Sequence, residues 1–363
     1  MAEKARAADA YAVGAREPLL SIRDLALDIA GPDGMRPILR VQALDLYPGE
    51  VLGLVGETGS GKTLTAMAVV QLFPTPHARI TGGSVRFRGR ELVGAGPREL
   101  AAVRGRRVGV IFQDPSTSLN PVFPVDEPLI RALRIHRGLS RAAARAEAER
   151  LLERVGLPGL VGKGRYPHEL SGGQRQRVMI ALALAGDPEL LIADEPTTAL
   201  DVTVQAQILR LLAELQRERR LAVIFITHNV SLLSGFADRV AVMYAGDVVE
   251  CGPTAAVLQR PQHPYTQLLL AAAPRLGSGA RRLAAIEGLP PSLRERPRGC
   301  AFADRCPRAA ERCRVEAPRL APVGEGGPAG GGAATGDGLA AGEGLAAGAG
   351  HAVACFFPGG EAQ

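Results

Sequence analysis

The feature that most constrains this chain is a glycine-rich segment of eight residues, GETGSGKT, at positions 56–63. It fits the pattern G-x-x-x-x-G-K-[ST] and lies between an apolar run, Val51–Val55, and a helical pattern over Leu64–Leu72. Glycines let backbone N–H groups turn toward phosphate oxygens, and the N-terminus of the following helix adds the positive end of its dipole. A glycine-rich strand-to-helix turn that binds nothing is the alternative, but the strand before the segment and the helix after it both fit a phosphate site. The segment therefore predicts a nucleoside triphosphate site.

Each residue type in this segment, the phosphate loop, has an expected task. We expect Lys62 to bind the β- and γ-phosphates and the hydroxyl of Thr63 to ligate Mg²⁺. The other residues are expected to contact the nucleotide through their backbone: Gly56, Glu57, Thr58, Gly59, Ser60 and Gly61.

Three further apolar strands end in polar residues that suit the same chemistry. The strands and the residues that follow them are Val108–Phe112 with Gln113, Leu190–Ala193 with Asp194 and Glu195, and Val223–Ile226 with His228. Ligands of open α/β sheets gather at the carboxyl ends of strands, so these residues are expected at one edge. We expect Asp194 to hold Mg²⁺ and Glu195 to be the general base that polarises the attacking water. Gln113 would reach both the metal ion and the water, and His228 the γ-phosphate.

The alternation of strand and helix patterns from Leu19 to about Leu276 indicates an α/β fold with a largely parallel sheet. One helical pattern places Ala148, Leu151, Leu152 and Val155 on a single face. Apolar residues make up 46% of the chain, yet no stretch is long enough for a membrane-spanning helix. The N-terminus has no apolar core of a secretory signal, and five cysteines in 363 residues favour a reducing location over a disulfide scaffold.

A second glycine-rich segment narrows the class of nucleotide-binding protein. Ser171, Gly172, Gly173 and Gln174 precede a helical run over Val178–Ala185. A serine and two glycines at a helix N-terminus form a second phosphate-binding surface. Since the phosphate loop already covers one side of its own nucleotide, this surface would serve the nucleotide of another subunit.

At this point the sequence resembles the ATP-binding subunits of ABC transporters over about residues 19–275. LSGGQ at 170–174 is their signature motif, and the phosphate loop, Gln113, Asp194-Glu195, Ala199-Leu200-Asp201 and His228 occur in their order and spacing. The resemblance implies a P-loop NTPase (RecA-like) core with a parallel sheet, an antiparallel β subdomain and a helical signature subdomain at about 114–170. It also implies that Asp201 lies in the D-loop and that ATP closes two such domains head to tail.

The run RVMIALAL (177–184) after the signature resembles the first of the two ATPases of the oligopeptide/dipeptide importer subfamily. Further segments also resemble this subfamily. These are FQDPSTSLNPV (112–122), IADEPTTALDVTVQAQIL (192–209), YAGDVVECG and HPYTQLLL (244–270), GLPPSL and RGCAFADRCPRAAERC. The resemblance implies a peripheral ATPase on the cytoplasmic face of the cell membrane. Its implied partners are a homologous second ATPase, two permease subunits and an extracytoplasmic solute-binding protein.

Two other functions stay open at this stage. Nickel importers of the same subfamily share much of the pattern, so a nickel or other small-solute importer is the first alternative. The second is a soluble ABC ATPase that acts on nucleic acid or ribosomes, since residues 131–165 carry nine Arg or Lys against three Asp or Glu. No aromatic residues interleave with these charges for base stacking, which favours a solvated helix face and no nucleic-acid partner. Such soluble ATPases also usually carry two cassettes or long coiled-coil insertions, and this sequence has neither.

The resemblance leaves adenine recognition open. Family members usually stack adenine on an aromatic residue before the phosphate loop, but no aromatic residue lies between Tyr11 and Tyr47. Arg36 or Arg40 would have to stack on the base instead, which a planar guanidinium can do.

The sequence divides into a flexible tail over 1–17, an ATP-binding domain over 18–275 and a C-terminal region over 276–363 that includes a Gly/Ala loop at 321–350. The C-terminal region holds four of the five cysteines, Cys300, Cys306, Cys313 and Cys355. Four thiolates suit a [4Fe–4S] cluster or a structural Zn²⁺, and the wide spacing favours the cluster. The alternative is four buried or incidental cysteines. Cys251, in the ATP-binding domain, is expected to take no part.

Overall fold

The computed structural model describes residues 17–31, 34–198, 200–272, 286–291, 297–324 and 350–359. The chain divides into two compact units, the first formed by residues up to 47, 52–93 and 228 onward, the second by 48–51 and 94–227. Nearly all of the predicted tail and of the predicted Gly/Ala loop lie outside the described residues, as does Ala199.

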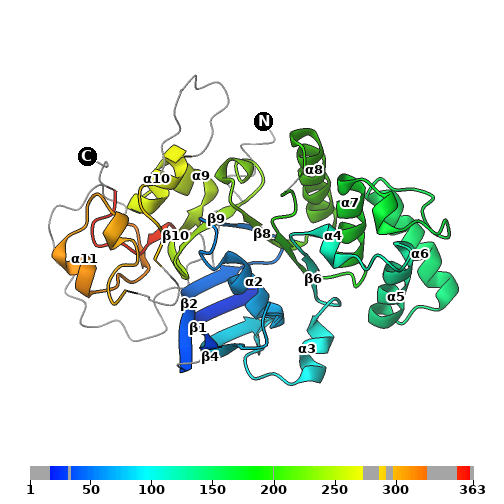
Figure 1. Ribbon diagram of the computed structural model, residues 1–363, viewed down its shortest axis with the longest axis horizontal. Helices are drawn as coiled ribbons and strands as arrows, with labels where there is room; N and C mark the ends of the chain where they lie inside the picture. The colour runs from blue at the N-terminus through cyan, green and yellow to red at the C-terminus, as the bar shows by residue number, and fades with distance from the viewer. Residues whose placement is uncertain are drawn as a thin grey trace. The chain divides into compact units, whose positions relative to one another are not determined.

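One part of the first unit is an antiparallel sheet with the strand order β2-β1-β4-β5. Its strands are β1 (Leu20–Gly31), β2 (Gly34–Leu46), β4 (Ala78–Phe87) and β5 (Arg90–Glu91). Buried and partly exposed residues alternate at the start of β1, as expected for a sheet that packs on one face. Helix α2 (Lys62–Val70) lies against β2 and β4 of this sheet (Figure 1). It begins two residues before the predicted helix, because Gly61 caps it in a left-handed conformation.

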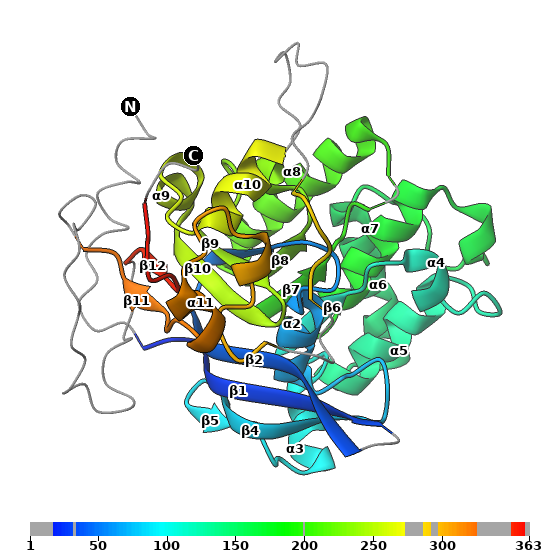
Figure 2. The same cartoon turned by 60° about the vertical axis from the view of Figure 1, so that its left-hand side comes forward.

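The remaining strands of the first unit follow the order β11-β12-β10-β9-β3. They are β3 (Val51–Val55), β9 (Arg239–Tyr244), β10 (Asp247–Pro253), β11 (Ala321–Pro322) and β12 (Ala352–Val353). β3 and β9 pair in parallel, whereas β10 pairs antiparallel with β9 and β12, so the sheet is more mixed than the sequence predicted. β12 and β11 continue the sheet beyond β10 (Figure 2), so two short C-terminal segments extend it. The helices here are η2 (Val230–Leu232), α9 (Thr254–Gln259), α10 (Pro264–Ala272), η3 (Ala303–Arg305) and α11 (Glu311–Val315).

The second unit holds three parallel strands in the order β8-β7-β6. They are β6 (Val108–Ile111), β7 (Leu190–Asp194) and β8 (Ala222–Thr227). Every residue of β7 and β8 is buried, which explains why these strands are apolar runs without alternation.

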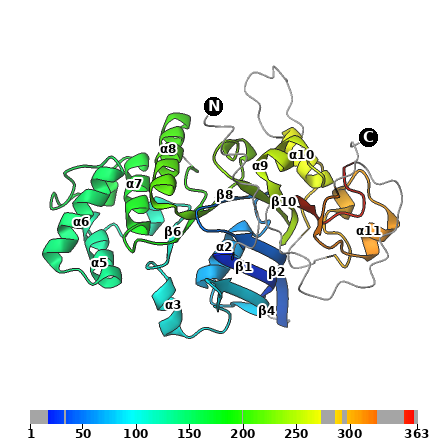
Figure 3. The same ribbon diagram turned by 180° about the vertical axis from the view of Figure 1, so that it is seen from behind.

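Helices make up most of the rest of the second unit. They are α3 (Pro97–Val103), α4 (Pro115–Ser118), α5 (Asp126–Arg137), α6 (Arg141–Arg154), η1 (Pro167–Glu169), α7 (Gly172–Ala183) and α8 (Val202–Arg219). α5, α6 and α7 pack against one another (Figure 3). The predicted apolar face Ala148–Val155 is buried, which confirms the amphipathic pattern. Among the described residues, no helix has the length and apolar character needed to cross a membrane.

Candidate functional site

The phosphate loop forms the turn from β3 into α2, as the sequence predicted. Two of its glycines are required by the backbone. Gly61 has a φ of 98°, and a Cβ there would lie 2.8 Å from a methyl carbon of Leu39. A Cβ on Gly56 would clash with the carbonyl oxygen of Met243. The Oγ of Ser60 is buried and has no hydrogen-bond partner among the described residues, as expected of a group in a loop that contacts a ligand.

Lys62 is buried at the start of α2, with 5% of its surface exposed. Its Nζ donates hydrogen bonds of 2.9 Å to the carbonyl oxygens of Gly56 and Glu57. The ammonium group is therefore held within the loop by main-chain atoms. The helix dipole and the lysine charge together favour an anion at this turn.

Two side chains that the sequence did not single out contact this loop. The hydroxyl oxygen of Tyr265, on α10, accepts the backbone N–H of Glu57 at 2.9 Å. Arg305, the last residue of η3, forms a two-point ion pair with the Glu57 carboxylate at 2.8 and 3.0 Å. They lie 208 and 248 residues beyond Glu57, so no local spacing could have indicated them.

In the second unit, two of the predicted strand-end residues, Gln113 and Glu195, are hydrogen-bonded to each other. Asp194 ends β7 and is 4% exposed, and Glu195 follows it with a left-handed φ of 45°. The Glu195 Oε2 accepts hydrogen bonds of 3.0 Å from Gln113 Nε2 and from the hydroxyl of Thr198. Sequence reasoning missed Thr198, although it lies only three residues from Glu195. A carboxylate held by an amide and a hydroxyl at a strand end can accept a proton from a water.

The signature segment forms a capped helix start, confirming a helix at that position although α7 begins six residues earlier than predicted. Ser171 is the N-cap of α7: its Oγ accepts the N–H of Gln174 at 3.2 Å, and the Gln174 side chain accepts the N–H of Ser171 at 2.9 Å. Gly172 and Gly173 form the first turn, and a Cβ on Gly173 would lie 2.7 Å from a methyl of Val204 on α8. Asp201 caps α8 through the N–H of Val204 at 2.9 Å.

Two predictions about the first unit stay open. His228 directly follows β8 and is exposed. The Arg40 guanidinium bonds Asp28 at 2.6 Å and the carbonyl oxygen of Leu39 at 2.7 Å, which orients it on the β1–β2 pair. Stacking of Arg36 or Arg40 on a base remains a prediction.

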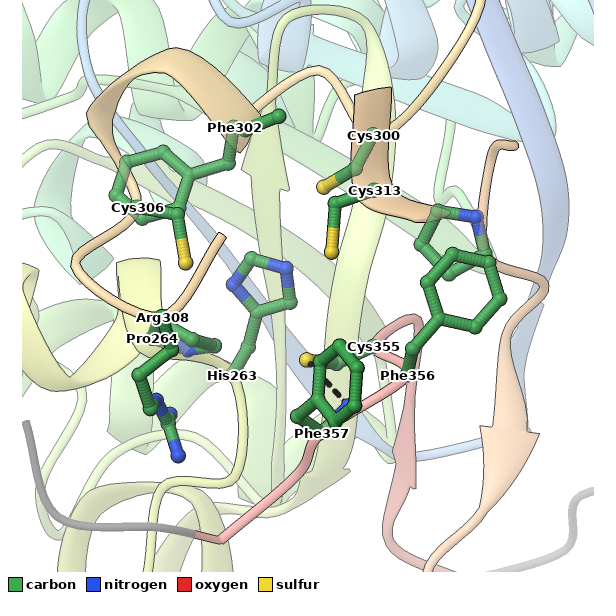
Figure 4. Close-up of a pocket in the computed structure, with 12 residues that line it drawn as sticks. His263, Pro264, Cys300, Phe302, Cys306, Arg308, Cys313, Cys355, Phe356 and Phe357 are labelled. Atoms are coloured by element: carbon green, nitrogen blue, oxygen red, sulfur yellow. Dashed lines mark hydrogen bonds between the residues drawn. The ribbon is translucent and has the colours of Figure 1, made fainter. Parts of the chain in front are cut away.

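The four C-terminal cysteines line one pocket, together with His263, Phe302 and Arg308. Figure 4 shows their sulfur atoms turned toward a common space. Burial raises the pKa of the Cys300 and Cys355 thiols to about 11, and it raises the pKa of Cys306, because it disfavours the thiolate. Cys251 lies in β10 and is not among the residues that line this pocket.

The donor set of this pocket is soft and suits zinc or iron rather than Mg²⁺. Within the described ranges, however, no group of three or more His, Cys, Asp or Glu side chains is placed to hold a metal ion. The predicted gathering of the four cysteines is thus observed, whereas a formed metal site is not.

Comparisons with known proteins identify the family of this chain. Residues 39–198 match the family described as ABC transporter, and residues 249–313 match the oligopeptide/dipeptide transporter C-terminal region. The chain is 48% identical over 309 residues to the oligopeptide transport ATP-binding protein of Salmonella typhimurium, covering 85% of this chain and 91% of that protein. It is 46% identical over 308 residues to a putative peptide import ATP-binding protein of Brucella melitensis, covering 85% and 92%.

Solved structures show the same fold. A dimeric ATP-binding cassette in a post-hydrolysis state with ADP and phosphate matches with a TM-score of 0.58 and 27% identity, over 65% of this chain and 98% of that one. The family matches, the identities and the shared fold lead to one conclusion: the chain belongs to the ATP-binding subunits of ABC transporters, in the group that carries the oligopeptide/dipeptide transporter C-terminal region.

Proposed function

We propose that this chain hydrolyses ATP to power the import of di- or oligopeptides through an ABC transporter. The observation that carries the proposal is the combination, in one chain, of an intact phosphate loop at the β3–α2 turn and a C-terminal region of the oligopeptide/dipeptide type. Its relatives in Salmonella typhimurium and Brucella melitensis carry names that state the same role.

The residues keep the roles that the sequence predicted for them. Lys62 binds the β- and γ-phosphates, Glu195 is the general base, and Gln113 and His228 assist at the water and the γ-phosphate. Mg²⁺, held by Thr63, Asp194 and Gln113, would neutralise charge on the phosphates. In this proposal, residues 18–275 form the ATP-binding domain, with its helical part at about 114–170.

The proposed assembly pairs this chain head to tail with a homologous ATPase. Ser171, Gly172, Gly173 and Gln174 would then contact the nucleotide bound by the partner, and Asp201 would lie at the same interface. A solved cassette of the same fold is dimeric, which supports this arrangement. Two permease subunits and an extracytoplasmic binding protein complete the assembly, which places the chain at the cytoplasmic face of the membrane.

The substrate is tested by transport. The complex is reconstituted from this chain and the proteins encoded beside it, and uptake of a labelled oligopeptide is compared with uptake of radioactive Ni²⁺. We expect saturable peptide uptake that requires ATP. Uptake of Ni²⁺ without peptide uptake would replace the proposal by the nickel importer, and ATP hydrolysis stimulated by DNA or ribosomes would replace it by the soluble ATPase.

We also propose that Cys300, Cys306, Cys313 and Cys355 hold a [4Fe–4S] cluster. Their common pocket supports this, since Fe–S clusters are held by four Cys thiolates. Protein purified without oxygen should be brown, with broad absorbance near about 400 nm and about four irons per chain. One equivalent of zinc would favour a structural Zn²⁺ instead. The absence of both metals would leave four buried or incidental cysteines and would refute this proposal.

A further inference from the structure

We propose that Arg305, in the C-terminal region, is a positioning residue for the phosphate loop, which it holds through the side chain of Glu57. This inference rests on the proposed assignment of residues 56–63 as the phosphate site. It adds a residue from outside the ATP-binding domain to the elements that set the affinity for ATP.

The guanidinium of Arg305 is fixed by as many hydrogen bonds as it has N–H groups. Two go to the Glu57 carboxylate, at 2.8 and 3.0 Å, and one to the hydroxyl of Tyr244, at 3.2 Å. The other two go to the backbone carbonyls of Glu287, at 2.9 Å, and Ile286, at 3.2 Å. Only 6% of the Arg305 side chain and 26% of the Glu57 side chain are exposed, so this ion pair is largely shielded from solvent.

Aromatic packing holds the segment that carries Arg305. Phe302 is 1% exposed and lies edge-on to the rings of Tyr244 and Tyr265, with ring centres 5.1 and 5.4 Å apart. The Arg305 guanidinium lies 5.7 Å from the centre of the Tyr244 ring, within the range of a cation–π contact. η3 therefore has a defined position relative to α10 and β9.

Every polar part of Glu57 is engaged in this arrangement. Its carboxylate bonds Arg305, its N–H donates to Tyr265, and its carbonyl oxygen accepts from Lys62 Nζ at 2.9 Å. The peptide group that holds the lysine thus belongs to the residue that the C-terminal region fixes. Arg305 also neutralises a carboxylate that would otherwise repel a triphosphate bound at this loop.

The test is a double-mutant cycle on the full chain, with ATP affinity measured by calorimetry. Glu57→Gln and Arg305→Gln should each weaken ATP binding by about tenfold, and the double variant should be no weaker than the worse single variant. Arg305→Lys should rescue only part of the loss, since a lysine cannot form the two-point pair. In the assembled transporter, KM for ATP should rise while kcat stays within about twofold, because Arg305 does not touch the reacting atoms.

One control variant and one further variant accompany the double-mutant cycle. Arg314→Gln removes the same charge from an exposed arginine of the same region, which pairs with Asp304, and should leave ATP affinity unchanged. Tyr265→Phe removes only the hydroxyl that accepts the N–H of Glu57, so it should weaken binding without changing any charge even if Arg305→Gln does not fold.

Three results would overturn the inference: wild-type ATP affinity in Arg305→Gln, additive losses in the double variant, or an equal loss in Arg314→Gln. Lys62→Ala separates this failure from failure of the proposed site. If Lys62→Ala binds ATP normally, the phosphate loop itself is wrongly assigned. If it loses binding and Arg305→Gln does not, only the role of Arg305 is wrong.

Discussion

Replacing Glu195 by glutamine tests the proposed general base with little change in shape. In the structure, one carboxylate oxygen of Glu195 accepts hydrogen bonds of 3.0 Å from Gln113 and Thr198. The amide oxygen of a glutamine can take that place and keep both bonds. The backbone at this position has a φ of 45°, which Glu and Gln tolerate equally. The substitution therefore removes the proton acceptor and leaves the geometry intact.

The expected effect follows from this comparison. Loss of a positioned base lowers the rate of hydrolysis by about 10²- to 10⁴-fold. That corresponds to about 3–5 kcal/mol in activation free energy. ATP affinity should stay within about twofold of the wild type, because the two hydrogen bonds persist and the phosphate loop is untouched.

The assay is phosphate release by the assembled transporter, together with ATP binding by the purified chain. Glu189→Gln is the matched control: it makes the same charge change just before β7 and removes an exposed ion pair with Arg107. Its turnover should equal that of the wild type. Turnover of Glu195→Gln within about tenfold of the wild type would refute the role given to Glu195.

Three further predictions test other parts of the account. Ser171→Ala removes a helix cap and should cost about 1 kcal/mol of stability. It should also slow ATP hydrolysis in the assembled transporter while ATP binding by the isolated chain stays normal. A large loss of ATP binding by the isolated chain would contradict the proposed site shared between two subunits. Gly173→Ala should lower the free energy of unfolding by about 1–3 kcal/mol, because its Cβ would lie 2.7 Å from Val204. Gly172→Ala should lower it by less, because the nearest atom to its Cβ would be a methyl carbon of Leu200 at 3.4 Å. Glu250→Ala should cost about 2–6 kcal/mol in urea unfolding, because each oxygen of this buried carboxylate accepts one backbone N–H, at 2.8 and 2.9 Å, and one oxygen also contacts His351 Nε2 at 2.6 Å. Glu250→Gln keeps one of the two oxygens and should cost less, and wild-type stability in Glu250→Ala would show that these bonds contribute little.

The sequence predicted the elements whose patterns are local. The phosphate loop, the buried runs of β7 and β8 and the capped start of α7 each depend on residues within a few positions of one another. A run such as Leu190–Asp194 is apolar throughout because both faces of the strand are buried. The exact starts of α2 and α7 were less predictable, since glycines and a serine cap begin these helices without contributing to an apolar pattern.

Contacts between distant segments could not be predicted. Nothing near Glu57 indicates that Arg305 pairs with it, because the pair depends on the path of the C-terminal region around α10 and β9. The pairing of β10 with β12 is equally non-local: Cys251 faces Ala352. The Cys300–Cys355 pocket could be predicted in part. The unusual density of cysteines indicated that they gather, but their spacing in the sequence did not give the geometry of the pocket.

The most direct test of the central claim is ATP hydrolysis by the complete transporter in proteoliposomes, measured with and without peptide-loaded binding protein. We expect the loaded binding protein to raise the rate, peptide to accumulate in proportion to ATP consumed, and Lys62→Ala in this chain to lower both. The account would be contradicted if the rate of ATP hydrolysis did not change with peptide and binding protein. It would also be contradicted if peptide uptake continued at the wild-type rate with Lys62→Ala.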